Sequence, residues 1–357
     1  MAFKKVPYLE WAHSKPAVKY NLTMSGVDNT TPEELGCRWE GIRFSGNNQY
    51  GYLPLLEAIA GRHGVLPANV VTASGTSMAN FLAVAALIER GDEVIIEKPC
   101  YGPLIDLPVA LGARIKRLPR EFTNGFQIDP ADLRRLASRK TKLIIISNLH
   151  NPSGVQIPQS TLEEIGDIAK TCKARVLVDE VYLDFLFGNT PPTSFRIDKQ
   201  FIVTSSLTKV YGLDGLRCGW ILCDEKLAQG IRRVRDYIDV NGSFPAEQMA
   251  CRLFHRLPEV LGKTMQTVAS NFPLVARFIA SRPELSWVPP AGGIICFPRH
   301  RRPSALDRFH ETLVREHETL VVPGKFFEFR AHFRLGFGLP SALLSEGLAN
   351  VGKALDS

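Results

Sequence analysis

One lysine, Lys209, lies between small hydroxyl residues and a downstream arginine in a glycine-rich segment that spans residues 205–220. A lysine amine can condense with an aldehyde. The Ser206 hydroxyl and the Arg217 guanidinium are groups that bind a phosphate, and the glycines permit the tight turns that would bring them together. The segment therefore predicts an anchor for a cofactor that carries an aldehyde and a phosphate. The alternative is a strand that ends in a basic, glycine-rich surface turn.

A second candidate phosphate site follows an expected short strand and precedes an expected helix. In the run Ala73–Ser77, backbone N–H groups and hydroxyls at a helix N-terminus can face a phosphate, and Gly75 and Thr76 lie at its centre. Such a turn can equally be a simple helix N-cap. Because Ser206 and Arg217 offer further phosphate contacts, we interpret this turn as part of the same site.

The lysine segment resembles the lysine motif of the class I/II family of pyridoxal-phosphate-dependent aminotransferases, S-x-S-K-x-x-G-x-x-G-x-R-x-G, with Thr208 in place of the second serine. Two more family motifs precede it in the family's order, an N-P-x-G turn at 151–154 and a D-x-x-Y pair at 179–182. The resemblance extends from residue 73 to residue 337. It implies the aminotransferase-like fold (fold type I), pyridoxal 5'-phosphate as cofactor, amino acid and 2-oxo acid substrates, and a homodimer with shared active sites.

The resemblance also implies a role for the residues that match these motifs. Lys209 would hold the cofactor as an internal aldimine and then move a proton from the substrate's α-carbon. An ionised Asp179 against the pyridine nitrogen would keep that nitrogen protonated, so that the ring can accept electrons. Tyr182 and Asn151 would share the phenolate oxygen of the ring, and the aromatic side chain of Tyr101 would lie over the ring.

Two further implied contacts lie toward the ends of the chain. Arg334, on an expected C-terminal strand, would bind the substrate's α-carboxylate with two parallel hydrogen bonds, and Asn151 would also contact the substrate. Tyr50 stands where the family has a tyrosine that reaches the phosphate of the neighbouring subunit's cofactor, with Asn48 or Tyr52 as alternatives. The identities of the amino donor and acceptor stay open.

The motifs predict an aminotransferase, but they leave the reaction open. A pyridoxal-phosphate-dependent lyase, cyclase or decarboxylase would use the same Lys209 and Asp179, because the reaction depends on which bond of the α-carbon lies perpendicular to the ring. A regulatory ligand sensor on this fold usually carries an added DNA-binding domain, and 357 residues leave no room for one. A nicotinamide dehydrogenase is disfavoured because no G-x-G-x-x-G follows an early strand.

The composition is typical of a soluble globular enzyme, with 45% hydrophobic and 22% charged residues. No apolar run has the length that a bilayer span requires, and the opening residues do not form an export signal. The positive charges behind the net charge of +7 are dispersed, so we expect no nucleic-acid partner. Seven cysteines without C-x-x-C spacing predict neither disulfides nor a zinc site. We therefore expect a cytoplasmic enzyme of amino acid metabolism or biosynthesis, with no metal and no membrane partner.

The elements that must position these residues alternate between short apolar runs and helical patterns from residue 70 to residue 225. This alternation predicts an α/β fold whose large domain has a mostly parallel sheet flanked by helices. A helix at 160–173 should begin with a capping box formed by Ser160 and Glu163. The other expected elements are strands at 93–97, 142–147, 175–179, 201–205 and 218–223, and helices at 77–90 and 245–281.

The chain beyond the long helix is expected to form a second, smaller domain. Its expected elements are strands at 294–297, 320–322 and 332–337 and helices at 304–318 and 341–355. This pattern predicts an α+β domain that the N-terminal segment completes. The expected division is therefore an N-terminal segment at 1–45, a large cofactor-binding domain at 46–281 and a small domain at 282–357.

Overall fold

A seven-stranded sheet organises the computed structural model, which describes residues 4–27, 31, 34–36 and 38–357. Cys37 and parts of the N-terminal segment expected at 1–45 lie outside the described residues. The strands follow the order β2-β8-β7-β6-β5-β3-β4. Their bounds are Val70–Ser74 (β2), Glu93–Lys98 (β3), Arg114–Pro119 (β4), Thr141–Ser147 (β5), Arg175–Asp179 (β6), Phe201–Ser206 (β7) and Cys218–Leu222 (β8).

Strand β8 runs antiparallel to both of its neighbours, β2 and β7, whereas the pairs among β3 to β7 are parallel. This arrangement confirms the prediction of a mostly parallel sheet. Parallel strands bring their carboxyl ends to one edge of the sheet, where open α/β sheets bind ligands. The loops that carry the predicted motifs therefore meet at one place.

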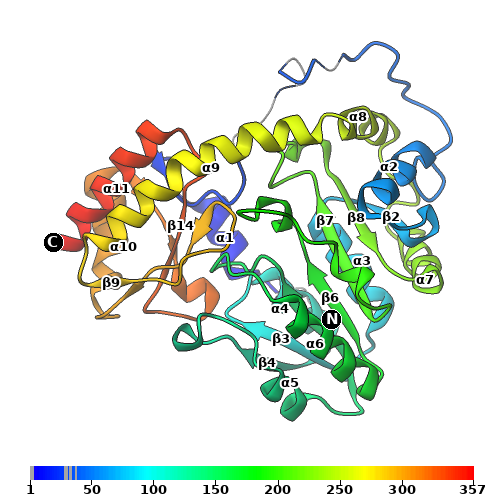
Figure 1. The fold of residues 1–357 in the computed structure, drawn as a ribbon, viewed down its shortest axis with the longest axis horizontal. Helices are drawn as coiled ribbons and strands as arrows, with labels where there is room; N and C mark the ends of the chain where they lie inside the picture. The colour runs from blue at the N-terminus through cyan, green and yellow to red at the C-terminus, as the bar shows by residue number, and fades with distance from the viewer. Residues whose placement is uncertain (1–3, 28–30, 32–33, 37) are drawn as a thin grey trace.

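Helices cover both faces of the sheet (Figure 1). Successive strand residues point to opposite faces, so that Ile95 and Ile144 enter one core while Ile96 and Ile145 enter the other. One face packs against α3 (Thr76–Leu87), α4 (Pro103–Ala110) and α7 (Glu225–Arg235). The other packs against α2 (Leu53–His63), α5 (Pro130–Leu136), α6 (Gln159–Cys172) and α8 (Phe244–Phe254).

The long helix α9 (Leu257–Ala280) leads from α8 to the C-terminal elements (Figure 1). These elements are β9 (Leu285–Ser286), β10 (Ile295–Cys296), β11 (Arg299–His300), α10 (Ala305–His317), β12 (Thr319–Leu320), β13 (Val322–Pro323), β14 (Phe333–Gly336) and α11 (Ser341–Asp356). The N-terminal elements are α1 (Pro7–Ser14) and β1 (Tyr20–Asn21), and β1 pairs in parallel with β12. Short 3-10 helices lie at Pro67–Asn69, Phe122–Asn124, Leu183–Phe185, Ser194–Arg196, Asp214–Leu216 and Gly324–Phe327.

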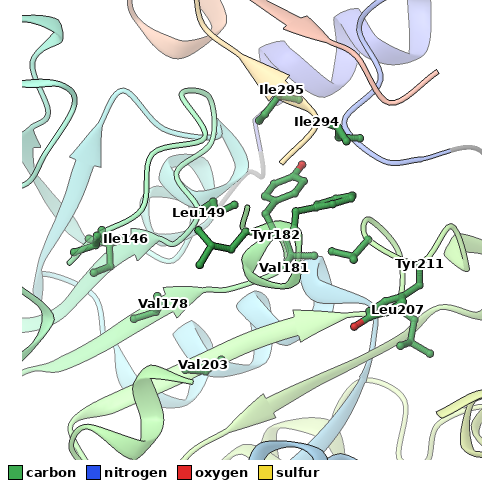
Figure 2. Packing of buried hydrophobic residues seen from close by; sticks show 14 of the residues in the cluster. Ile146, Leu149, Val178, Val181, Tyr182, Val203, Leu207, Tyr211, Ile294 and Ile295 are labelled. Carbon is green, nitrogen blue, oxygen red and sulfur yellow. The ribbon is translucent and has the colours of Figure 1, made fainter. Parts of the chain in front are cut away.

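One hydrophobic core continues from the sheet into the C-terminal elements. Figure 2 shows Tyr182 between residues of the sheet and residues next to β10, and the labelled side chains of these two groups are Val178, Val203, Ile294 and Ile295. Tyr182 is therefore held by packing from both sides. The division at 1–45, 46–281 and 282–357 stays a prediction.

Two expectations about helices are wrong. The capping box is not formed, because α6 begins at Gln159 after Pro158 and has no side-chain cap. The expected helix at 245–281 is divided into α8 and α9. Pro258 lies in the first turn of α9, where its missing N–H cannot continue the hydrogen bonds of α8, so a new helix begins there.

Among the described residues, no helix is long and apolar enough to cross a bilayer. The six cysteines within that part of the chain are free. No group of three or more histidine, cysteine, aspartate or glutamate side chains suited to a metal ion occurs there either. The cytoplasmic location stays a prediction.

Candidate active site

A cavity of about 200 Å³ lies at the carboxyl ends of the central strands. Eight of the residues singled out in the sequence line it, namely Thr76, Tyr101, Asn151, Asp179, Tyr182, Ser206, Lys209 and Arg217. They come from segments that are far apart in the sequence and follow different strands. Gly75, Tyr50 and Arg334 do not line this cavity, and their places are described below.

One end of the cavity is suited to a phosphate. Helix α3 begins at Thr76, and its N-cap, Gly75, has a positive φ of 83° and no side chain to cap the first N–H groups. The Thr76 hydroxyl donates to Ser206 Oγ at 2.8 Å, and Arg217 Nη2 donates to the Ser74 carbonyl at 3.2 Å. A helix N-terminus, two hydroxyls and a guanidinium together form a site for an anion.

This end is built by a close approach of two backbones. A Cβ atom at Gly219, in β8, would lie 2.6 Å from the carbonyl carbon of Gly75. A Cβ atom at Gly75 would lie 2.5 Å from Arg217 Nη2. Side chains at these two positions would therefore separate β8 from the beginning of α3 and fill the cradle.

Lys209 lies at the other side of the cavity in a desolvated position. Burial lowers the pKa of its amine to about 8, and the positive charge of Arg334 adds to this effect. Its Nζ atom donates to Ser25 Oγ at 3.4 Å. A lowered pKa makes an uncharged, nucleophilic amine available closer to neutral pH.

Four residues that are expected to contact the cofactor ring line the cavity. Burial raises the pKa of Asp179 to about 6 and that of Tyr182 to about 12. The Tyr101 ring makes an edge contact with Tyr8 at a centroid distance of 5.5 Å. The Asn151 side chain uses its oxygen as an acceptor, and its Nδ2 atom has no hydrogen-bond partner among the described residues.

Arg334 is 1% exposed and lies behind residues that line the cavity. Its Nη1 atom donates to Asn151 Oδ1 at 3.0 Å, and its Nη2 atom donates to the Tyr8 hydroxyl at 3.0 Å and to the Thr23 carbonyl at 3.1 Å. Its Nε atom is buried without a partner, and no ion pair to an acidic side chain of the described chain is formed. A buried guanidinium without a counter-charge is suited to a carboxylate ligand.

A buried ion pair lies under the loops that carry Tyr101 and Asn151. Arg120 Nη1 donates to Glu97 Oε2 at 2.6 Å, and both side chains are fully buried. Glu97 Oε1 accepts from the Ser147 backbone N–H at 2.8 Å and from its hydroxyl at 2.5 Å. Ser147 Oγ in turn accepts from the Asn151 N–H at 3.2 Å. The pair thus connects the ends of β3, β4 and β5.

Tyr50 lies outside the cavity, in a separate hollow near residues 236–241. The residues named as its alternatives are engaged elsewhere, because Glu247 Oε2 accepts from Asn48 Nδ2 and from the Tyr52 N–H, each at 3.0 Å. Asn48 is buried, and the Tyr52 ring makes an edge contact with Phe244 at a centroid distance of 5.4 Å. Tyr50 is partly exposed, has a positive φ of 61° and lines the hollow. Of the three, Tyr50 is therefore the side chain best placed to reach outward.

Three cavity residues were missed from the sequence, namely Tyr8, Ser25 and Asn80. Tyr8 lies in α1 and reaches the site only because the N-terminal segment folds over it, which no local pattern indicates. Ser25 lies in the connection between β1 and α2, outside the predicted motifs. Asn80 interrupts the apolar helix α3, and a polar residue at such a buried position was a signal that could have found it.

A family model for class I and II aminotransferases matches residues 41–351. The chain belongs to this family. Its cofactor is pyridoxal 5'-phosphate. The site fits this group, because the cradle at Gly75 has room and charge for a phosphate and the cavity holds an amine that can bind an aldehyde.

Several members of the family resemble this chain over its whole length. Capreomycidine synthase from Streptomyces vinaceus is 30% identical over 99% of this chain and 94% of its own. A pyridoxal-phosphate-dependent aminotransferase from Streptococcus suis superposes with a TM-score of 0.94 at 28% identity, over 100% of this chain and 98% of its own. A pyridoxal-phosphate-dependent cyclase superposes with a TM-score of 0.91 at 25% identity, over 100% and 98%. The relatives thus include both transfer and cyclisation enzymes.

Proposed function

We propose that this chain is an aminotransferase that moves an amino group between an amino acid and a 2-oxo acid. The observation that carries the proposal is the buried Arg334, whose guanidinium has no acidic partner within the described chain and lies next to the cavity that holds Lys209. An α-carboxylate is the group that amino acids and 2-oxo acids share. Bound through Arg334, it would orient either substrate toward the same amine.

The residues of the cavity have complementary roles in this proposal. Bound pyridoxal phosphate supplies an electron-accepting ring. Lys209, whose burial lowers the pKa of its amine, anchors the cofactor and moves a proton to and from the substrate's α-carbon. Asp179 supports the positive charge on the ring nitrogen. Tyr182 and the free Nδ2 of Asn151 contact the ring oxygen, and the aromatic side chain of Tyr101 covers the ring.

The phosphate of the cofactor is assigned to the cradle at the beginning of α3. Its ligands are the N–H groups that follow Gly75, the hydroxyls of Thr76 and Ser206, and the Arg217 guanidinium. Two of these ligands flank Lys209 in the sequence, because Ser206 ends β7 and Arg217 directly precedes β8.

A second candidate function is cyclisation or another lyase-type reaction on an amino acid. The observation that favours it is the similarity to capreomycidine synthase and to a pyridoxal-phosphate-dependent cyclase. Lys209 and Asp179 would serve that reaction without change, because the orientation of the substrate decides which bond breaks. Decarboxylation of an amino acid would use the same two residues.

We also propose that the enzyme is a homodimer with shared sites. Val240 is 58% exposed and lines the same hollow as Tyr50. The two segments that form this hollow also carry Phe44, which is 88% exposed, and Tyr237, which is 92% exposed. Exposed apolar side chains of this size are typical of an interface. A second copy on this surface would cover them and would receive Tyr50 near its phosphate cradle.

A donor and acceptor screen tests the proposed reaction. The purified holoenzyme is incubated with single amino acids, and the amino form of the cofactor, the 2-oxo product and free ammonia are measured. Transamination predicts that a reactive donor yields the amino form and that a 2-oxo acid reverses the change. Lys209→Ala should lower kcat by about a thousandfold. Ammonia or a cyclic product without the amino form, for every reactive donor, would contradict transamination and support the second candidate.

A further inference from the structure

One polar side chain is buried in the otherwise apolar part of α3 that packs on the sheet. Asn80 is 6% exposed, and its neighbours Ala79 and Leu82 belong to the hydrophobic core. An amide buried in such surroundings destabilises the fold unless its donor and acceptor atoms are both bonded. The partners of Asn80 therefore indicate why it is there.

Asn80 connects a hydroxyl in β7 with the carboxylate at the end of β6. Thr204 is fully buried, and its hydroxyl donates to Asn80 Oδ1 at 2.6 Å. Asn80 Nδ2 then donates to Asp179 Oδ2 at 3.1 Å. The second oxygen, Oδ1 of Asp179, accepts from the Val181 N–H at 3.1 Å. Both carboxylate oxygens are thus tied to a donor.

The orientation of the Asn80 amide gives this relay its direction. The amide oxygen accepts from the Thr204 hydroxyl, and the amide nitrogen faces Asp179. That nitrogen is a donor only, so its partner oxygen must be an acceptor, which an ionised carboxylate is at every lone pair. With the amide reversed, its oxygen would face Asp179, and only a protonated carboxyl could bind it.

We propose that Thr204 and Asn80 are positioning residues that keep the Asp179 carboxylate ionised and hold it in a fixed orientation toward the cavity. The relay deepens the proposed function, since it rests on the role of Asp179 as the partner of the ring nitrogen. Neither residue needs to touch the cofactor ring for this purpose. Their effect passes through the carboxylate.

The surroundings of Asp179 explain why such support is needed. Burial raises the pKa of this carboxyl, and the hydrogen bonds from Asn80 and Val181 oppose that rise, so that the pKa stays at about 6. The titratable groups that share the cavity with it are Lys209, Tyr8, Tyr101, Tyr182 and Arg217. Glu180 is turned away, because its carboxylate accepts from Thr193 and Ser194. Of the cavity groups, Lys209 favours the ionised form by its charge.

The test compares Thr204→Val, which removes the hydroxyl at nearly constant volume, with Thr204→Ser, which keeps it. For each holoenzyme, the dissociation constant of pyridoxal phosphate is measured by absorbance from pH 5 to pH 9. Thr204→Val should weaken binding by roughly tenfold, the effect of one hydrogen bond lost from the relay. The pH below which binding weakens should also move upward, because Asp179 would protonate sooner. Thr204→Ser should bind within about twofold of the unchanged protein.

Thr193→Val is the matched control. It also removes a buried threonine hydroxyl, and that hydroxyl donates at 2.8 Å to a buried carboxylate, Glu180, adjacent in the chain but turned away from the cavity. It should lower the melting temperature as much as Thr204→Val does while leaving cofactor binding and its pH dependence unchanged. An equal loss of cofactor affinity in both variants would overturn the relay, because the effect would then be one of stability.

The variant Asp179→Ala distinguishes a failure of the relay from a failure of the proposed role of Asp179. If Asp179→Ala weakens cofactor binding and Thr204→Val does not, the relay is wrong and the role of Asp179 stands. If Asp179→Ala binds the cofactor as the unchanged protein does, the proposed role of Asp179 fails, and the relay fails with it. Asn80→Leu should reproduce the shift of Thr204→Val, and it provides a second variant should Thr204→Val fail to fold.

Discussion

Burial acts on Lys209 and Asp179 by the same physical cause and moves their pKa values in opposite directions. In each case the uncharged form is favoured, so the pKa of the amine falls to about 8 and that of the carboxyl rises to about 6. The two groups therefore approach the pH range in which enzymes work. Proton transfer by Lys209 benefits, because a base is most efficient when its pKa is near the operating pH.

The lowered pKa of Lys209 predicts the pH dependence of its reactivity. Only the uncharged amine is nucleophilic, so carbamoylation of Lys209 by cyanate in the cofactor-free protein should rise with pH and level off above about pH 8. An amine at the ordinary pKa of 10.5 would continue to gain reactivity up to that value. Peptide mapping by mass spectrometry gives the labelling rate of Lys209 at each pH.

Lys19 serves as the internal control for this measurement. A hydrogen bond with Tyr20 raises the pKa of the Lys19 amine, so its labelling should continue to increase beyond the pH at which Lys209 levels off. Parallel labelling profiles for the two lysines would show that Lys209 is not desolvated, and the proposed proton transfer would lose its support.

For individual residues, the residue types and their order in the chain predicted much of the lining of the cavity. Asn151, Asp179 and Lys209 follow successive strands, and parallel strands bring such positions together. Tyr8 could not be predicted in this way. Its hydroxyl accepts from Arg334, more than three hundred residues later, through packing that no local pattern encodes.

Among the elements, the strand ends depend on the buried pair of Glu97 and Arg120. Glu97→Ala should lower the free energy of unfolding by about 3 to 5 kcal/mol, because it leaves a buried guanidinium without its counter-charge. Urea unfolding followed by circular dichroism measures this loss. The change should also loosen the Asn151 loop, since Glu97 holds Ser147 and Ser147 holds that loop.

An exposed pair provides the comparison for Glu97→Ala. Arg134 Nη2 lies 3.1 Å from Glu164 Oε2, and more than half of each side chain is exposed. Glu164→Ala should cost far less stability, because water already screens the two charges. Losses of similar size in the two variants would mean that the pair under the loops does not support the strand ends.

Short apolar runs predicted most strands of the sheet within one or two residues, because these strands are buried on both faces. The edge strand β4 was missed, because its sequence includes the basic residues Arg114, Lys116 and Arg117. Helix ends were harder. Ser160 followed by Glu163 has the spacing of a capping box, yet α6 begins one residue earlier, directly after Pro158. The fixed φ of a proline can set a helix start that side-chain patterns do not reveal.

At the scale of the whole molecule, the position of Tyr50 outside the cavity of its own chain predicts that activity depends on two copies of the chain. Tyr50→Phe should weaken pyridoxal phosphate binding by roughly tenfold, since it removes one hydrogen bond to a phosphate of the partner subunit's site. Mixing equal amounts of the Lys209→Ala and Tyr50→Phe chains should restore native cofactor affinity and activity in one of the two sites of each hybrid dimer, which is about a quarter of all sites when the chains pair at random. Only a hybrid dimer combines an intact Lys209 with an intact Tyr50 in one site.

Activity of the mixture at limiting cofactor, measured after unfolding and refolding the two chains together, is the readout. The same two variants refolded separately and then combined are the control, because hybrids do not form if the dimers stay intact. No gain on joint refolding would mean that Tyr50 does not act across an interface. The expected partner surface would then have to lie elsewhere than at Phe44 and Tyr237.

The order of the motifs along the chain predicted the overall architecture. It did not predict where single helices and strands are divided in two. The helix expected at 245–281 is two helices, and the strand expected at 320–322 is divided between β12 and β13, which pair with different partners. Such divisions depend on which distant segment each residue meets. A single sequence carries little information about that choice.

The contact between Gly75 and Gly219 places a constraint on how sequences with this site can diverge. A methyl group at Gly219 would meet the backbone of Gly75 and move the beginning of α3 away from β8. A methyl group at Gly75 would instead meet the Arg217 guanidinium, at a residue whose φ is positive. Each position therefore has its own reason to remain glycine. In a related sequence, a side chain at the position of Gly75 or of Gly219 would indicate that the phosphate cradle has been lost, even where the lysine motif remains.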